Sequence, residues 1–145
     1  MTLTSRLTAA ELSAALRPSL LRLTRILRNQ RVDLSVTLTQ LSAMATLSKK
    51  GPMSAGELAA FERVQPPSMT KVLASLEDKE LVRRDAHPTD KRQAIIVLTN
   101  AGARLLESER RQRDAWLSQR LARLTPDERA RLRDVIPVLD KLAEL

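Results

Sequence analysis

The sequence has 145 residues, a length typical of one domain. It contains no cysteine and a single histidine, which excludes a disulfide framework, a thiolate metal site and a His-rich metal site. The net charge of +8 favours an anionic partner, of which nucleic acid is the first candidate. The excess lies mainly in residues 1–50, with 8 basic and 2 acidic residues, whereas residues 51–100 hold 7 of each. A solvated helix face explains such a charge run equally well.

Several classes of protein are disfavoured by what the sequence lacks. The N-terminal stretch MTLTSRLTAAEL has no apolar core of a signal peptide, and no apolar run approaches the roughly 18 residues of a membrane span. We therefore expect a cytoplasmic protein with no membrane partner. There is no Gly-rich phosphate loop and no Ser/His/Asp or Cys/His set, so we predict that the protein is not an enzyme and needs no cofactor or metal.

Capping boxes mark the starts of the first three helices. In each, a Ser or Thr is followed three residues later by Glu or Gln, so that side chains and backbone N–H groups satisfy one another. These patterns begin at Thr8, Thr37 and Ser54 and predict helices over residues 9–30, 38–49 and 55–62. Pro18 should bend the first helix or delay its start, because proline removes a backbone donor.

The next helix, predicted over residues 67–79 after the short joint RVQP, has two contrasting faces. One is a buried stripe at helical spacing, made by Met69, Val72, Leu73 and Leu76. The opposite face carries Ser68, Thr70, Lys71, Ala74 and Ser75, with no acidic residue between Arg63 and Ser75. A small, mildly cationic face of this kind can approach phosphates and base edges closely.

Two short strands follow, predicted over residues 81–84 and 94–98 and joined by the turn AHPTDKR. Thr99 should cap a helix over residues 100–123, and a further capping box at Thr125 starts a last helix over 126–145, which Pro137 should kink. The fold class is thus mainly α with a small β-hairpin. The order is a short helix, a tight joint, a helix with a polar face and a hairpin. This order predicts a winged helix-turn-helix over residues 37–99, in which the 67–79 helix would lie in the major groove.

Two segments carry a resemblance to a known family. TDKRQAIIVLTNAG, residues 89–102, has an Asp, one residue, an Arg and a strand that ends in Leu-Thr shortly before a Gly. VQPPSMTKVLASLEDKELVRR, residues 64–84, has the recognition helix and the first wing strand. The chain resembles the MarR family of bacterial transcriptional regulators over essentially its whole length. It departs at Glu80, where the family has glycine after lysine, so Glu80 should adopt a left-handed conformation.

The resemblance implies a homodimer on a near-palindromic double-stranded DNA operator, with repression as the expected outcome. Residues 1–36 and 100–145 would be the dimerisation helices. These helices are also richer in apolar residues than a small winged-helix core can bury within one chain. The resemblance further implies a small-molecule effector at the junction of the dimer and DNA-binding regions.

DNA contacts are expected on the recognition helix and on the wing. In the family the wing arginine, here Arg92, reaches the minor groove, and Asp90 would fix the wing by pairing with Arg92 or by capping the turn. His87 is interpreted as a turn residue. A solvated surface is the alternative for all of these residues. The full DNA-binding set is Ser68, Thr70, Lys71, Ser75, Arg63, Arg84, Asp90, Lys91 and Arg92, with Arg83 as a further phosphate contact.

One alternative function stays open at this point. A winged-helix adaptor would bind another protein through its apolar helices, without specific DNA binding. The wing Asp90/Arg92 pair and the acid-free helix face favour DNA.

Overall fold

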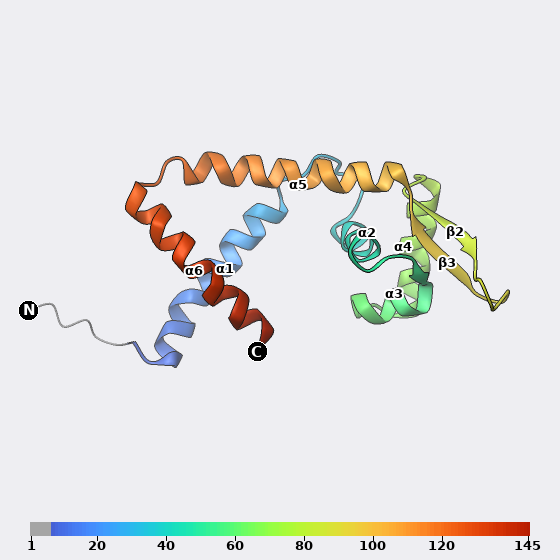
Figure 1. The fold of residues 1–145 in the computed structure, drawn as a ribbon, viewed down its shortest axis with the longest axis horizontal. Helices are drawn as coiled ribbons and strands as arrows, with labels where there is room; N and C mark the ends of the chain where they lie inside the picture. Colours follow the sequence, from blue (N-terminus) through green and yellow to red (C-terminus); the bar gives the residue numbers. More distant parts are fainter. Residues whose placement is uncertain (1–6) are drawn as a thin grey trace, which may run out of the picture. The chain divides into compact units, whose positions relative to one another are not determined.

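The computed structural model describes residues 7–145. Residues 1–6 lie outside this range. They belong to the predicted dimerisation segment and to the N-terminal stretch that lacks the apolar core of a signal peptide. The chain divides into two compact units, Arg31–Arg111 and the segments up to Gln30 and from Gln112, and each is described by itself. The elements (Figure 1) are α1 Ala9–Arg28, α2 Leu38–Lys50, β1 Met53–Ser54, α3 Ala55–Glu62, α4 Pro66–Asp78, β2 Val82–Ala86, β3 Ala94–Leu98, α5 Asn100–Leu121 and α6 Pro126–Glu144.

The helix starts follow the predicted caps. Thr8, Thr37, Ser54 and Thr125 all form complete capping boxes. Hydrogen bonds from the N–H and the hydroxyl of the capping threonine hold the pKa of Glu11 and Glu128 below the usual range. The predicted helix ends agree within about two residues, the usual uncertainty of such boundaries. Pro18 does not delay α1, which begins at Ala9.

The sheet has one strand more than the predicted hairpin. β2 and β3 pair antiparallel, with Val82 opposite Leu98 and Ala86 opposite Ala94. β1 pairs with the other edge of β3, which gives the order β1-β3-β2. The two-stranded prediction was therefore incomplete, because a strand of two residues has no recognisable alternation and its Ser54 also caps α3.

The core lies in the Arg31–Arg111 unit and is entirely aliphatic. Three members of the predicted stripe of α4 are buried, with Met69, Leu73 and Leu76 at 1%, 0% and 0% exposure, and the fourth, Val72, is partly buried against the core. Around it pack Met44 and Leu47 of α2, Leu58 of α3 and Ile96 of β3, among others. The three helices gather against the sheet, and the hairpin of β2 and β3 extends away from them as a wing (Figure 1). The mainly α fold with a winged helix is confirmed.

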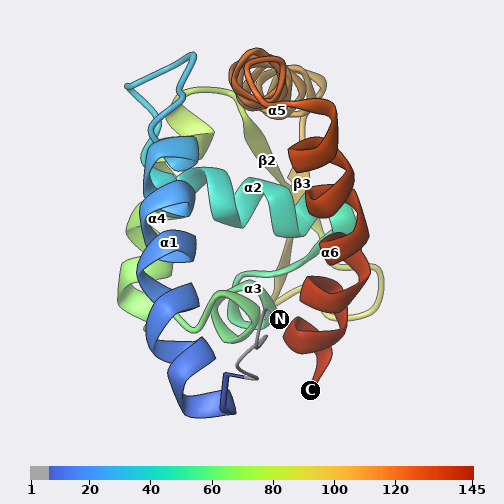
Figure 2. The ribbon, with the colours of Figure 1, turned by 90° about the vertical axis from the view of Figure 1, so that its left-hand side faces the viewer.

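The described part of the other unit, residues 7–30 and 112–145, has no comparable core within one chain. Neither α1 nor α6 contains a buried residue. In Figure 2 these two helices stand apart over most of their length. Many of their large apolar side chains are exposed: Leu12, Leu20, Leu21, Leu23, Leu132, Val135, Ile136, Val138 and Leu142. Across residues 7–145, no helix combines the length and the apolar character that crossing a membrane requires.

Candidate nucleic-acid interface

The outer face of α4 is small, polar and free of acidic residues through its first three turns. Its side chains Ser68, Thr70 and Lys71 are exposed, and Ser75 is half-buried. The hydroxyl of Thr70 donates to the Pro66 carbonyl at 3.0 Å, which leaves its lone pairs toward solvent. The buried stripe on the other side fixes the rotation of α4, so this polar face must point outward.

The joint before α4 is closed by a left-handed residue that is not glycine. Arg63 has φ 53° and ψ 42° and ends α3, while Val64 N–H donates to the Ala59 carbonyl at 3.0 Å. Such a turn satisfies the last carbonyls of a helix and reverses the chain in very few residues. The exposed Arg63 side chain is thereby placed beside the N-terminal end of α4. No glycine marks this turn in the sequence, and the left-handed conformation of Arg63 was not predicted.

The C-terminal end of α4 is also followed by a left-handed residue, Glu80, as the sequence predicted. This residue has φ 57°, so the predicted left-handed conformation is confirmed. Its N–H donates to the Glu77 carbonyl at 2.8 Å, and Leu81 N–H donates to the Leu76 carbonyl at 3.0 Å. The chain therefore turns from α4 into β2 within three residues.

The base of the wing is tied directly to the first turn of α5. Thr99 donates its hydroxyl proton to the Glu80 carbonyl at 2.7 Å and accepts from Gly102 N–H at 3.1 Å, so it caps α5 as predicted. Its own N–H donates to the Leu81 carbonyl at 3.1 Å. A Cβ at Gly102 would lie 2.3 Å from that same Leu81 oxygen, so only glycine permits this close approach.

Two arginines of β2 already have acidic partners in the chain. Arg84 forms an ion pair with Glu77 at the end of α4, and Arg83 Nε lies 3.1 Å from an oxygen of Asp85. Arg84 was predicted to contact phosphate. In this structure its guanidinium joins the wing to the C-terminal end of α4.

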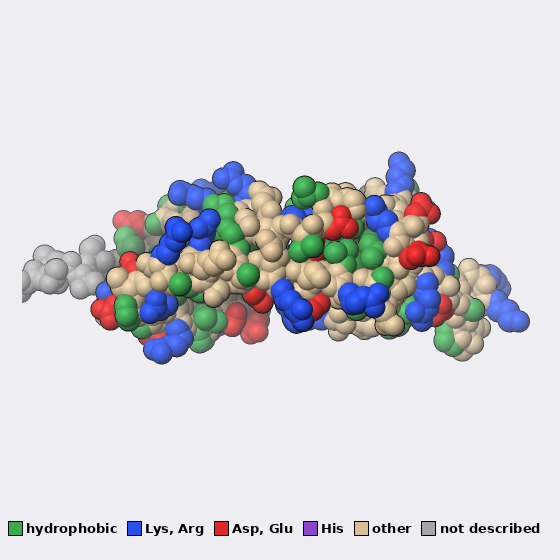
Figure 3. Space-filling model, turned by 90° about the horizontal axis from the view of Figure 1, so that it is seen from above, with side chains coloured by type: hydrophobic (Ala, Val, Ile, Leu, Met, Phe, Trp, Pro, Cys, Tyr) green, Lys and Arg blue, Asp and Glu red, His purple; other side chains and the backbone are tan. Residues whose placement is uncertain are grey.

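At the tip of the wing Asp90 caps a turn. Its Oδ1 accepts from the backbone N–H of Arg92 at 3.0 Å, and Gln93 Nε2 donates to Oδ2 at 3.4 Å. Among the described residues no ion pair joins the side chains of Asp90 and Arg92, so the structure has the capping arrangement rather than the pair. Lys91 and Arg92 are both exposed. Figure 3 shows basic side chains on the right-hand part of the surface, where Figure 1 has the wing.

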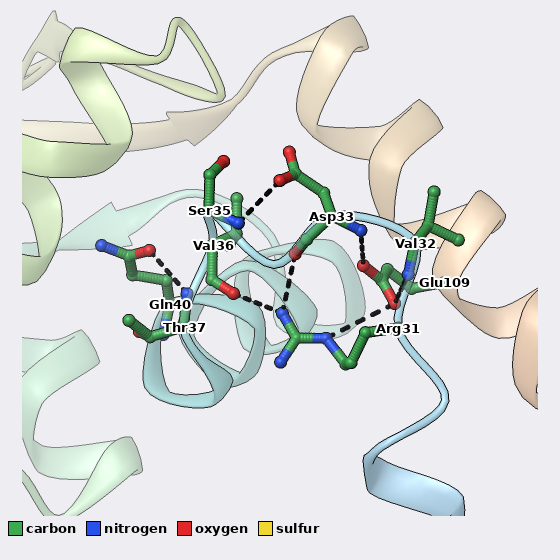
Figure 4. A network of polar contacts seen from close by, with 8 residues as sticks. All are labelled: Arg31, Val32, Asp33, Ser35, Val36, Thr37, Gln40 and Glu109. Carbon is green, nitrogen blue, oxygen red and sulfur yellow. Dashed lines mark hydrogen bonds and ion pairs between the residues drawn. The ribbon is translucent and has the colours of Figure 1, made fainter.

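A buried polar network lies at the N-terminal end of the Arg31–Arg111 unit, and it was not predicted from the sequence. Glu109 of α5 is fully buried, and its carboxylate accepts from the N–H groups of Val32 and Asp33, each at 3.1 Å (Figure 4). Arg31 donates to the carbonyls of Asp33 and Val36. Hydrogen bonds from the side chain and backbone of Ser35 lower the pKa of Asp33. The segment that leads into α2 is thus held on α5. Glu109 carried no sequence signal because its neighbours Glu107 and Arg111 form an ordinary surface pair.

No group of three or more acidic or histidine side chains within residues 7–145 is arranged to hold a metal ion. The site consists instead of a polar helix face, a capped wing tip and exposed cations, a set suited to binding an anionic duplex.

Comparison with known proteins places this site in a family. The MarR family model matches residues 36–94, which contain the joint, α4 and most of the wing. An HTH-type transcriptional regulator of Mycobacterium leprae is 42% identical over 135 residues, 93% of this chain and 94% of that protein. The chain belongs to the MarR family. As a member of this family it is a transcriptional regulator with a winged-helix DNA-binding fold, and such regulators are not enzymes.

Two further relatives agree with this assignment. The HTH-type transcriptional repressor NicR of Pseudomonas putida is 32% identical over 93 residues, 64% of this chain and 59% of that protein. The crystal structure of a transcriptional regulator from Pseudomonas aeruginosa, 31% identical, superposes with a TM-score of 0.81 over 94% of this chain and 95% of its own.

Proposed function

We propose that this MarR-family chain binds a near-palindromic DNA operator as a homodimer, with α4 in the major groove and Arg92 of the wing in the minor groove. The observation that carries the proposal is the pairing of an acid-free, outward-facing α4 with a wing whose base is bonded to both α4 and α5. An exposed arginine on a firmly held hairpin suits the negative potential of a narrow minor groove.

The predicted contact residues have distinct roles in this proposal. Lys71 and the hydroxyls of Ser68, Thr70 and Ser75 face the groove from α4, while Arg63 and Lys91 meet phosphates at its two ends. Asp90 shapes the wing tip without touching DNA. Arg84 would reach a phosphate only by leaving Glu77.

We propose the dimer because large apolar side chains of α1 and α6 are exposed. Residues 1–36 and 100–145 would form the dimer interface. A cavity of about 450 Å³ is lined almost wholly by α1, from Ala9 to Leu21, together with Leu142 of α6. So many exposed large apolar side chains on two helices are unusual in a monomer and are typical of an obligate interface. A second copy of the chain is the occupant that the family assignment favours.

Two such copies would present their recognition helices to successive major grooves, about 10 base pairs apart. Repression is the proposed outcome, supported by the similarity to the repressor NicR. We further propose, from the family, a cytoplasmic protein that a small-molecule effector releases from DNA. An adaptor that binds only protein is not favoured, because it needs neither an acid-free α4 nor a capped basic wing tip.

The test compares Lys71→Ala and Arg92→Ala with Lys49→Ala, a control that removes an exposed cation of α2 outside the proposed DNA and dimer interfaces. DNA from the chain's own promoter region is titrated at several salt concentrations. We expect each interface variant to lose about tenfold or more in specific affinity. Loss of a phosphate contact at Lys71 should also lower the salt slope by about one. Equal affinities and slopes for all four proteins would remove these two residues from the interface.

A further inference from the structure

The only histidine of the chain lies at the start of the wing turn and acts as a hydrogen-bond acceptor. Its Nδ1 accepts from the backbone N–H of Asp90 at 3.0 Å and from that of Thr89 at 3.2 Å. The Thr89 hydroxyl lies 3.3 Å from the same nitrogen. This is the geometry in which Asn or Asp side chains usually organise a turn, with an imidazole in their place.

The acceptor role fixes the protonation state of the ring. Nδ1 can accept two N–H groups only while it carries no proton, so the turn requires the neutral tautomer protonated at Nε2. In a doubly protonated ring both nitrogens are donors, and both backbone hydrogen bonds are lost together. Histidine is the side chain that ordinarily changes charge between about pH 5 and 8.

The consequence reaches the DNA-binding arginine through Asp90. The backbone of Asp90 is held by His87, and its carboxylate in turn holds the N–H of Arg92. We propose that His87 is a positioning residue of the wing: its neutral form holds Asp90 and Arg92 in the DNA-binding conformation, and acid releases them. The inference rests on the proposed function for its effect on DNA affinity.

The charged groups of the wing support this direction of change. Asp85 is occupied by Arg83, while Lys91 and Arg92 are cations that do not attract a second positive charge. Asp90 is the remaining carboxylate of the tip, and it serves as the cap of the Arg92 N–H. A protonated ring would draw this carboxylate away, so the cap would be lost along with the two acceptor bonds.

The expected sign is opposite to that of simple electrostatics. Acidification adds positive charge to a protein and normally strengthens its attraction to phosphates. A histidine that contacted DNA directly would strengthen binding in the same way. A wing held by neutral His87 instead weakens binding as the pH falls, so the direction of the change separates the two roles.

The first experiment measures operator affinity at pH 7.5 and pH 5.5, at fixed salt, for the full chain, His87→Asn and His87→Ala. The Asn side-chain oxygen can accept the same N–H groups but does not titrate. We expect the unmodified chain to lose roughly tenfold on acidification, the scale of a lost hydrogen bond or two. His87→Asn should keep normal affinity at both pH values, and His87→Ala should be weak at both. Unchanged or stronger binding of the unmodified chain in acid overturns the proposal, as does the same acid loss in His87→Asn.

The second experiment needs no DNA. With a single histidine, the ring ¹⁵N signals are unambiguous. Nδ1 should be the unprotonated nitrogen at neutral pH, and the amide signals of Thr89, Asp90 and Arg92 should move with the ring as it titrates. Amides that do not follow the ring overturn the His87 proposal even where operator binding is normal. Absence of operator binding at pH 7.5 contradicts the proposed function instead, and the amide signals then report on the turn alone.

Discussion

An oxygen of the Glu109 carboxylate lies 3.6 Å from Nε of Arg31, and both side chains are shielded from solvent, at 0% and 9% exposure. The pair is imperfect: Arg31 Nε is buried without a hydrogen-bond partner, while the carboxylate is satisfied by two backbone N–H groups. Glu109 thus contributes mainly as an acceptor for the chain entering α2. A buried carboxylate with this role cannot be deleted without leaving two buried donors and a cation uncompensated.

We therefore expect Glu109→Ala to lower the free energy of unfolding by about 3–5 kcal/mol. Glu107→Ala, two residues away on the solvent side of α5, removes only surface pairs with Arg110 and Arg111 and should cost less than about 1 kcal/mol. Urea unfolding at one fixed protein concentration measures both. Similar losses for the two variants would show that the network does not stabilise the fold.

A second expectation concerns the contact between α5 and the base of the wing. Gly102→Ala places a methyl group 2.3 Å from the Leu81 carbonyl oxygen, a clash with backbone that side-chain movement cannot relieve. We expect a loss of about 2 kcal/mol or more and weaker DNA binding, because the wing base must shift.

Gly56→Ala is the matched control. Gly56 lies in α3, and the nearest atom to an added Cβ is the Ser54 hydroxyl oxygen at 4.0 Å. This change should raise stability by up to about 1 kcal/mol through helix propensity. We expect thermal unfolding to give shifts of the melting temperature of opposite sign for the two variants, and shifts of the same sign would contradict the close approach at Gly102.

The left-handed conformation of Glu80 gives a third expectation. Glu80→Gly relieves the clash of a Cβ at φ 57° and should stabilise the chain by about 1 kcal/mol, with operator affinity unchanged. Arg63→Gly relieves the same strain at φ 53° but also removes a proposed phosphate contact. It should gain stability and lose affinity. Unfolding and DNA titration together separate these effects, and a loss of affinity in Glu80→Gly would contradict the assignment of that residue to the scaffold.

The ion pair between Arg84 and Glu77 gives a fourth expectation. Glu77→Gln removes the carboxylate that holds Arg84 and also removes a negative charge from the end of α4. If Arg84 can reach phosphate, nonspecific DNA affinity should rise and its salt slope should steepen by about one. Glu77→Gln with Arg84→Ala should return to the original slope. An unchanged slope in the single variant would assign Arg84 to bracing the wing alone.

Local signals account for what the sequence predicted well. Capping boxes fixed four helix starts, and the i, i+3, i+4, i+7 stripe of α4 fixed which of its faces is buried. These signals depend on residues only a few positions apart. The left-handed Glu80 was predicted in another way, from the glycine that the family has at this position.

The features that were missed depend on tertiary contacts. β1 exists because two residues before α3 meet the free edge of β3. Glu109 is buried because the chain entering α2 packs on α5, 76 residues away in sequence. Arg63 adopts a left-handed turn with no glycine to mark it, because the packing of α3 against α4 imposes the tight joint. No local pattern contains this information, and it had to come from the folded chain.

The two left-handed residues, Arg63 and Glu80, also mark the ends of a segment that could be exchanged between relatives as one piece. Arg63 and Glu80 stand on either side of α4, and at such backbone angles Val, Ile and Thr are disfavoured while Gly, Asn and Asp are accepted. Between them, residues 64–79 supply one buried stripe to a fixed core and one exposed face, which in the proposed function meets the major groove. Swapping this segment among relatives, with junctions at the two turns, should therefore transplant operator preference while leaving the scaffold intact.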